Sequence, residues 1–246
     1  MPALIDGDRL IKYEDAAVHF VVPQHIRYIE ELAFAGSDSL VSIELPQAVD
    51  YIGNYAFRMC SCLQEITLPD NIISAGSGLF QHCWKLKSIR LPEGMEMIGG
   101  EMFESCHGLR SLTIPDSIVK IERNAFSGCR NLTEIMIDPS RIRILPASAR
   151  SVAALTYMER NSVDGGSSDI DEYAWERQGN LLDLAINRRN AEAVRYMLRR
   201  GLVTEAALRE YLRRSAVRNR VEITALLLEY GRSVTTEDPF EEDPFK

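Results

Sequence analysis

A fixed period of 23 residues runs through more than half of this 246-residue chain and constrains its fold more than any other feature. Internal periods of 20 to 50 residues are the signature of stacked repeats. Since one such unit cannot bury its apolar face alone, the period predicts an array of coils that share a core. An apolar residue followed by proline marks each unit, and Ile137 stands one step further on: the pairs are Val22-Pro23, Leu45-Pro46, Leu68-Pro69, Leu91-Pro92 and Ile114-Pro115.

Other apolar positions keep the same period and define the unit. Its segment Leu-x-x-Ile-x-Leu ends in strict alternation, which predicts a short strand whose Ile and last Leu point inward while the residue between them points outward. The proline that follows removes a backbone donor and ends the strand. Strands of neighbouring units are expected to pair in parallel, about 4.8 Å apart. The recurring positions are Phe34, Phe57, Phe80, Phe103 and Phe126; Leu40, Leu63, Leu86, Leu109 and Leu132; and Ile43, Ile66, Ile89, Leu112 and Ile135.

The unit resembles the leucine-rich repeat of the bacterial surface antigen type, often called BspA-like, over about residues 17–146. The resemblance implies an α/β repeat solenoid, a right-handed coil of six 23-residue units with parallel strands, and a protein- or glycan-binding scaffold rather than a catalyst. One departure, Ala75-Gly76-Ser77-Gly78, puts a small residue where Ile is expected, so this coil is expected to be looser or bulged. The hallmarks are Ile52-Gly53-Asn54-Tyr55-Ala56-Phe57, Cys60, Leu63, Ile66 and Leu68-Pro69.

The rhythm breaks after Leu145, and helical spacing of apolar residues replaces it. Asp6-Gly7 between two short apolar runs predicts a hairpin at the other end of the array. The expected organisation is an N-terminal cap (1–16), the solenoid (17–146), a capping helix (147–160), a linker (161–171), an all-α module (172–234) and an acidic tail (235–246).

The helical module resembles ankyrin repeats. Residues 185–201 align with residues 216–231 at an offset of 31 that becomes 30 after one gap. The ankyrin period is close to this, at about 33 residues. The usual Thr-Pro-Leu-His opening is missing, and Leu181-Leu182-Asp183 stands in its place. The sequence therefore predicts a degenerate, ankyrin-like module.

The charge of the chain is acidic overall, with 36 Asp and Glu against 28 Lys and Arg, for a formal charge of −8. Residues 177–232 are instead basic, with twelve Arg against six Asp and Glu. A basic helical patch is one feature of nucleic-acid-binding proteins. Here the arginines fall mainly at polar positions near helix ends, where they complement the helix dipole. We therefore expect solvated helix faces and no nucleic-acid partner.

Four cysteines share one repeat position, and Cys62 is the fifth. His82 and His107 lie beside two of these four cysteines in the sequence, so a metal site along this row of cysteines is one hypothesis. Free cysteine is more often a small buried hydrophobe, however, and Cys60-Ser61-Cys62 is too short for the usual ligand pairs. We expect no metal and no cofactor, and the odd count favours a reducing compartment. The ladder is Cys60, Cys83, Cys106 and Cys129.

No catalytic motif appears around the four histidines, so the chain is predicted not to be an enzyme. No apolar run reaches the 18 or more residues of a membrane span, so no membrane insertion is expected. The first residues carry Asp6 and Asp8 where a secretory signal would carry basic residues. A cytoplasmic location is therefore expected, with the cell surface or secretion as the alternative.

Candidate partner-binding residues come from three places. The outward residues of the strands form a ladder, and Trp84 stands at a slot that is otherwise polar. An exposed tryptophan is a frequent interface anchor. The acidic tail repeats Asp-Pro-Phe and so offers two aromatic anchors. The candidates are Glu44, Thr67, Trp84, Arg90, Thr113, Met136, Phe240 and Phe245.

These observations favour an intracellular, bacterial protein–protein interaction scaffold that uses the leucine-rich surface. A surface adhesin for host matrix proteins, which the family resemblance implies, is the first alternative. An enzyme with an unrecognised site between the two modules is the second. The sequence leaves the partner and the oligomeric state open.

Overall fold

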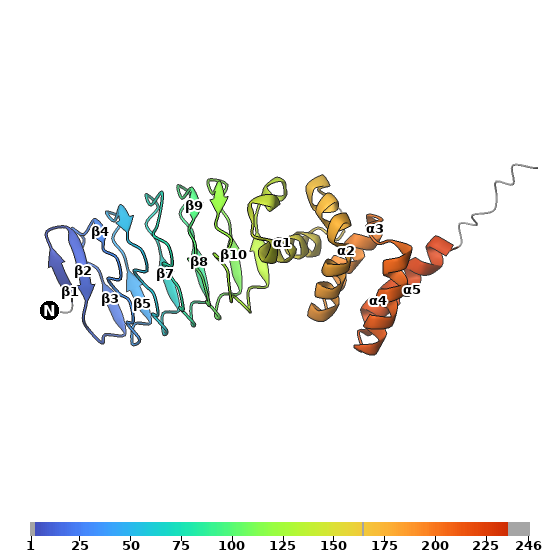
Figure 1. The fold of residues 1–246 in the computed structure, drawn as a ribbon, viewed down its shortest axis with the longest axis horizontal. Helices are drawn as coiled ribbons and strands as arrows, with labels where there is room; N and C mark the ends of the chain where they lie inside the picture. Colours follow the sequence, from blue (N-terminus) through green and yellow to red (C-terminus); the bar gives the residue numbers. More distant parts are fainter. Residues whose placement is uncertain (1–2, 164, 236–246) are drawn as a thin grey trace, which may run out of the picture. The chain divides into compact units, whose positions relative to one another are not determined.

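The computed structural model describes residues 3–163 and 165–235. Two compact units make up the chain, Met1–Ala153 and Ala154–Lys246. Figure 1 shows stacked coils in the first unit and packed helices in the second. The expected architecture, a solenoid of about six 23-residue turns followed by a helical region, is confirmed.

Short strands recur along the solenoid at the predicted places. Most parallel partners lie one repeat apart, as in Ile43↔Ile66 and Ile66↔Ile89, so the sequence period is also the strand register. The strands are β1 (Ala3–Asp6), β2 (Arg9–Tyr13), β3 (His19–Val21), β4 (Tyr28–Ile29), β5 (Ser42–Glu44), β6 (Tyr51–Ile52), β7 (Glu65–Thr67), β8 (Ser88–Arg90), β9 (Met97–Ile98), β10 (Ser111–Thr113), β11 (Lys120–Ile121) and β12 (Glu134–Met136).

The strands form two ladders along the array, a front ladder of three-residue strands and a back ladder in which two-residue strands follow the longer β1 and β2. The front ladder is ordered β3-β5-β7-β8, followed by a separate pair β10-β12. The back ladder is ordered β1-β2-β4-β6, followed by a separate pair β9-β11. Each ladder is therefore interrupted once, and the interruption of the front ladder falls between β8 and β10.

The core between the ladders holds a stack of phenylalanine rings. Consecutive rings from Phe34 to Phe126 lie 5.0, 5.6, 5.8 and 5.9 Å apart, with interplanar angles of 16° or less. All five side chains are buried. Because each ring contacts the ring of the next coil, the stack couples neighbouring units and makes the core continuous.

The cysteine ladder has a structural role in the same core. Each of its thiols donates a hydrogen bond to the carbonyl of the phenylalanine in the preceding coil, as in Cys83 Sγ to Phe57 O at 3.1 Å. Burial raises the pKa of the Cys60 thiol to about 12 and that of the Cys129 thiol to about 11. These thiols stay protonated at neutral pH, which suits their role as hydrogen-bond donors in the core.

The coil that contains Ala75 departs from the repeat as the sequence suggested. A single bridge between Ile52 and Ala75 replaces a back strand, and the back ladder is interrupted there. The coil is still held, because the Gly76 amide donates to the Ile52 carbonyl at 3.0 Å. A Cβ at Gly76 would lie 2.3 Å from the Asn54 nitrogen, so the close approach of the two coils requires glycine.

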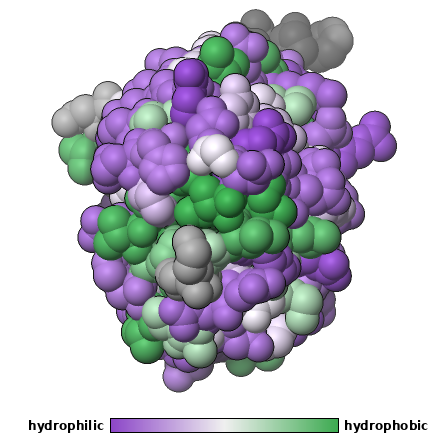
Figure 2. Space-filling model, turned by 90° about the vertical axis from the view of Figure 1, so that its left-hand side faces the viewer, coloured by the Kyte–Doolittle hydropathy of each residue, from purple (hydrophilic) through white to green (hydrophobic). Residues whose placement is uncertain are grey.

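The predicted N-terminal hairpin is confirmed: β1 and β2 pair antiparallel, and β2 joins β4 in parallel. The hairpin extends the back ladder and leaves the outer edge of β3 without a partner strand among the described residues. Figure 2 shows apolar side chains gathered on this end of the solenoid. Exposed large apolar side chains there include Leu4 at 56%, Val18 at 61% and Val21 at 48%.

At its other end the array continues into a 3-10 helix (Pro139–Ile144) and helix α1 (Ala147–Arg160). The helical region continues with α2 (Ser168–Arg188), α3 (Ala191–Arg199), α4 (Glu205–Val217) and α5 (Val221–Thr235). Helix α2 begins inside the range that the sequence assigned to a linker. Helix α2 packs against α3 and α4, and α5 packs against α3 and α4.

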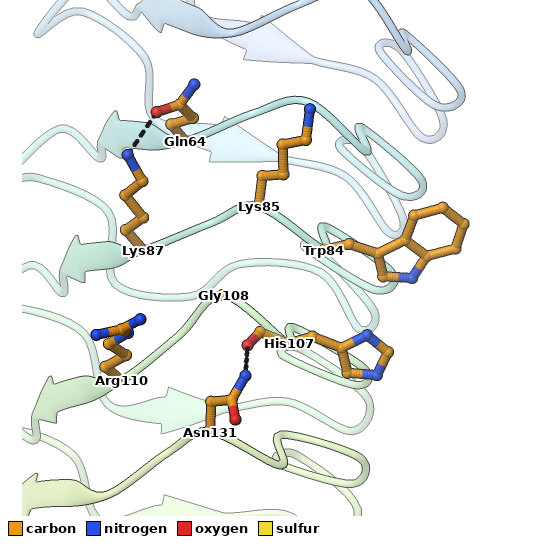
Figure 3. A pocket seen from close by; sticks show the side chains of 8 residues that line it. All are labelled: Gln64, Trp84, Lys85, Lys87, His107, Gly108, Arg110 and Asn131. Atoms are coloured by element: carbon orange, nitrogen blue, oxygen red, sulfur yellow. Dashed lines mark hydrogen bonds between the residues drawn. The ribbon is translucent and has the colours of Figure 1, made fainter.

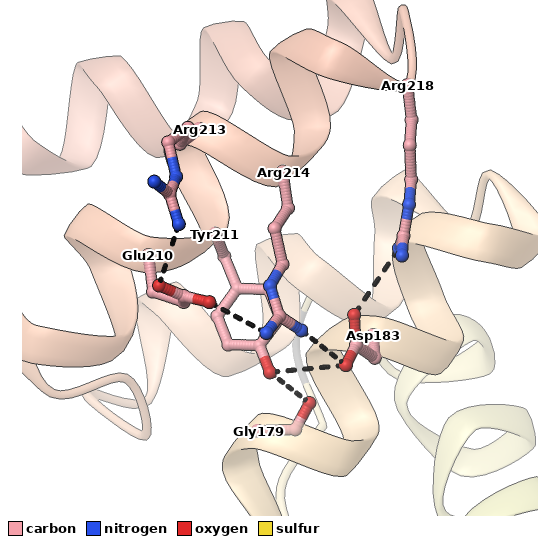
Figure 4. Close-up of polar contacts among 7 residues, drawn as sticks. All are labelled: Gly179, Asp183, Glu210, Tyr211, Arg213, Arg214 and Arg218. Atoms are coloured by element: carbon pink, nitrogen blue, oxygen red, sulfur yellow. Dashed lines mark hydrogen bonds and ion pairs between the residues drawn. The ribbon is translucent and has the colours of Figure 1, made fainter.

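Carboxylates of the helical unit pair with many of its arginines. Asp183 on α2 accepts from Nη1 of Arg214 on α4 at 2.7 Å and from Nη1 of Arg218, the C-cap residue of α4, at 3.3 Å (Figure 4). The Tyr211 hydroxyl donates to the Gly179 carbonyl at 2.9 Å and so ties α4 to α2 a second time. Much of the local positive charge is thus balanced inside the unit, as expected for structural helix faces.

Candidate binding groove

The outward ladder of the front strands is exposed as predicted, except at its end. Glu44, Thr67, Arg90 and Thr113 are exposed, whereas Met136 is half-buried. Arg90 faces Asp70 across 3.6 Å, and Glu44 lies 3.5 Å from a ring nitrogen of His19. The ladder is therefore a polar surface. Its two charged side chains, Glu44 and Arg90, each lie close to a polar side chain, His19 and Asp70.

A groove lies beside this ladder, on the segments that enter the front strands. It encloses about 670 Å³ and crosses neighbouring coils (Figure 3). The residues that line it are Gln64, Trp84, Lys85, Lys87, His107, Gly108, Arg110 and Asn131.

The repeat brings these residues together. Gln64, Lys87 and Arg110 occupy the position after the repeat leucine in successive coils, so stacking places them side by side. The position before that leucine holds Lys85 in one coil and Gly108 in the next. In Figure 3, Lys87 and Arg110 lie on the strand side of the groove, and the rings of Trp84 and His107 lie on the opposite side.

Gly108 leaves a hollow in the middle of this surface. A Cβ there would lie 2.7 Å from the Leu86 carbonyl oxygen and 2.9 Å from the Trp84 carbonyl oxygen. The two coils therefore approach so closely that only glycine fits, and no side chain fills the position. The floor of the groove is thus backbone.

The row of backbone hydrogen bonds between the coils is interrupted immediately after this point. Elsewhere along this row the amide of one coil donates to the preceding coil, as in Lys87 N to Gln64 O at 3.0 Å and Thr133 N to Arg110 O at 2.9 Å. No such bond joins Arg110 N to Lys87 O within residues 3–163. This missing bond precedes the interruption between β8 and β10, so the groove lies where the front ladder opens.

The groove is positively charged in an acidic chain. Lys87 Nζ donates to Gln64 Oε1 at 2.7 Å, and Lys85 Nζ lies 3.4 Å from Cys62 Sγ, so both ammonium groups have only neutral partners. The Arg110 guanidinium forms no ion pair with any residue that the structure describes. None of the eight lining residues is acidic. Three cations without a carboxylate partner form a site that attracts an anion.

Trp84 adds an aromatic surface to these charges. Its side chain is 49% exposed, so about half of the indole remains available to a partner. His107 stands at the same repeat position one coil further on. Charged and aromatic groups in one concave site are typical of interface anchors.

Of the predicted binding residues, the groove includes only Trp84. Arg90, Glu44, Thr67, Thr113 and Met136 lie outside its lining. Phe240 and Phe245 lie outside the described residues. No motif in the sequence singles out Lys85, Lys87 and Arg110, although a comparison of charge at equivalent repeat positions finds two lysines and one arginine in adjacent coils.

Across the described ranges no group of three or more His, Cys, Asp or Glu side chains could hold a metal ion. Among the helices of residues 3–163 and 165–235, none combines the length and apolar character of a membrane span.

Comparison with known proteins identifies the repeat. A family model described as the BspA type leucine-rich repeat region matches residues 12–133 and 78–198 in six copies. No curated protein matches the chain. The ankyrin-like interpretation of the helical module receives no support, because the matched model describes leucine-rich repeats.

Two solved structures share the solenoid. A leucine-rich cell surface protein from Faecalibacterium prausnitzii is 33% identical, with a TM-score of 0.54, over 56% of this chain and 38% of the other. A leucine-rich repeat protein from Eubacterium ventriosum is 23% identical, with a TM-score of 0.51, over 54% of this chain and 37% of the other. This chain thus spans well under half of the length of either relative. The family match covers most of the chain and agrees with the observed coils, and the chain belongs to the BspA-type leucine-rich repeat family.

Proposed function

We propose that the solenoid is a non-enzymatic scaffold that binds a partner protein, and that the groove at Trp84 is its contact site. The observation that carries this proposal is the set of three cations without carboxylate partners beside a half-exposed indole. Leucine-rich arrays present extended surfaces and few closed pockets, which suits them to binding.

The groove favours an acidic, extended segment of the partner. Lys85, Lys87 and Arg110 can each meet one carboxylate, and the indole of Trp84 can pack against an apolar side chain. Because the ammonium groups are exposed and salt screens exposed charges, we expect binding to weaken as ionic strength rises. The shallow, polar ladder of front strands then flanks the contact.

Photo-crosslinking tests this proposal directly. A benzophenone amino acid replaces Trp84 in one variant and Val119, which is 71% exposed on a different part of the coil, in the control. Each variant is exposed to cell extract and to the cell-surface fraction of the producing organism. A product at position 84 that unlabelled chain competes away, and that is absent at position 119, supports the groove. Equal products at both positions, or none at position 84, would refute it.

The location of this activity is a second question. The five free cysteines favour an intracellular scaffold, whereas the similarity to a cell surface protein of Faecalibacterium prausnitzii favours an adhesin. The fraction that gives the crosslinked product decides between them. Binding to immobilised host matrix proteins, lost on Lys85→Glu, would favour the adhesin.

The non-enzymatic assignment stays a proposal and rests on the family resemblance.

A further inference from the structure

We infer that the acidic Asp-Pro-Phe segment of this chain, Glu237–Phe245, is itself a ligand of the Trp84 groove. This inference rests on the proposed function, because it names an occupant for the same groove. The described residues end at Thr235, and residues 236–246 continue the chain beyond them.

Charge is the first argument for this occupant. The segment carries five carboxylates and no basic residue between Glu237 and Phe245. The groove carries three cations: the two lysines have only neutral partners, and the arginine forms no ion pair with any described residue. Charge complementarity of this kind steers association and fixes the register of a bound segment. The carboxylates are Glu237, Asp238, Glu241, Glu242 and Asp243.

Spacing is the second argument. Phe240 and Phe245 are five residues apart, which in an extended bound segment corresponds to about 17 Å. The groove runs from the coil of Gln64 to the coil of Asn131, three coil steps of about 4.8 Å each, or about 14 Å. Trp84 lies in the second of these coils, about 10 Å from the coil of Asn131. When Phe240 meets Trp84, the carboxylates that follow it can cross the coil of Arg110, and Phe245 lies past the coil of Asn131.

Residue chemistry is the third argument. Proline holds its own φ and disfavours the helical region in the residue before it, so Asp-Pro is suited to an extended bound form. Phenylalanine supplies the apolar ring that an exposed indole can pack against. The groove floor at Gly108 is open backbone, which leaves room for an extended chain to lie across the coils.

The test is a fluorescence polarisation titration with a labelled peptide of residues 236–246. The receptor is the full chain carrying Phe240→Ala and Phe245→Ala, so that its own segment does not compete. Saturable binding is expected, with Kd at least tenfold weaker when Lys85→Glu and Lys87→Glu are added. The matched control, Lys120→Glu with Arg123→Glu, makes the same change of charge elsewhere on the solenoid and is expected to alter Kd less than twofold.

Several outcomes would overturn the inference. No binding of the peptide would overturn it, and so would an equal loss of affinity in the control variant. Equal affinity for a peptide with both phenylalanines replaced by alanine would also overturn it, because the binding would then come from charge attraction alone. Binding of a heparin-derived oligosaccharide without binding of the peptide would also overturn it and assign the groove to sulfated glycans. If the peptide fails while the crosslink at position 84 persists, the groove still binds a partner, and only the inferred occupant is wrong.

Discussion

The buried thiol of Cys60 makes a prediction about stability at alkaline pH. The thiol is fully buried and donates to the Phe34 carbonyl at 3.1 Å. Burial raises its pKa from 9.0 to about 12. A folded-state pKa above the unfolded value means that the thiol contributes stability below about pH 9, and that this contribution is lost progressively between about pH 9 and pH 12.

The size of the effect follows from this shift. At pH 7 the Cys60→Ala variant is expected to be less stable by about 1–2 kcal/mol, from a lost hydrogen bond and lost packing. At pH 10 the thiol ionises in the unfolded chain of the unaltered protein but stays protonated in the fold. This ionisation stabilises the unfolded state by about 1.4 kcal/mol, one pH unit above its pKa. The difference in stability between the two proteins should therefore fall to near zero.

Urea denaturation at both pH values, under reducing conditions, measures this difference. Other titrating groups are common to both proteins and cancel in it. Val49→Ala, at a fully buried apolar position, serves as the control whose stability difference should not change with pH. If the Cys60→Ala variant is less stable than the unaltered protein by the same amount at pH 7 and at pH 10, burial does not raise the pKa of the thiol, and the prediction is wrong.

Three further substitutions test the packing of the coils. Phe80→Ala removes a buried ring that stacks on both neighbours and should lower the free energy of unfolding by about 3–5 kcal/mol in urea denaturation; a loss under about 1 kcal/mol would contradict a continuous ring stack. Gly76→Ala places a Cβ 2.3 Å from the Asn54 nitrogen and should cost about 1–3 kcal/mol, so an unchanged melting temperature would show that the coils do not approach so closely. Ser105→Gly replaces a residue at φ 58° and should stabilise the chain by about 0.5–1 kcal/mol in thermal unfolding, unless the left-handed turn is absent in solution.

The groove shows why a site of this kind escapes prediction from a single sequence. Lys85 and Lys87 are near in sequence, but Arg110 is a full repeat away, and the three meet only because coils stack. The sequence analysis did identify Trp84, since a tryptophan at an otherwise polar slot is visible in the repeat alignment. It also selected Arg90, which the structure places outside the groove lining and beside Asp70.

The repeat pattern of the sequence predicts the solenoid, its period and its inward residues. It could do so because every coil must bury the same slots against its neighbours, so the pattern repeats and each repeat confirms the others. Only the packing of the coils against one another shows where the front ladder of strands is interrupted. The close approach at Gly108, the missing hydrogen bond between Arg110 and Lys87 and the donor role of the Cys60 thiol all depend on distances between coils. Those distances are set by the packing of the whole stack, and no single repeat encodes them.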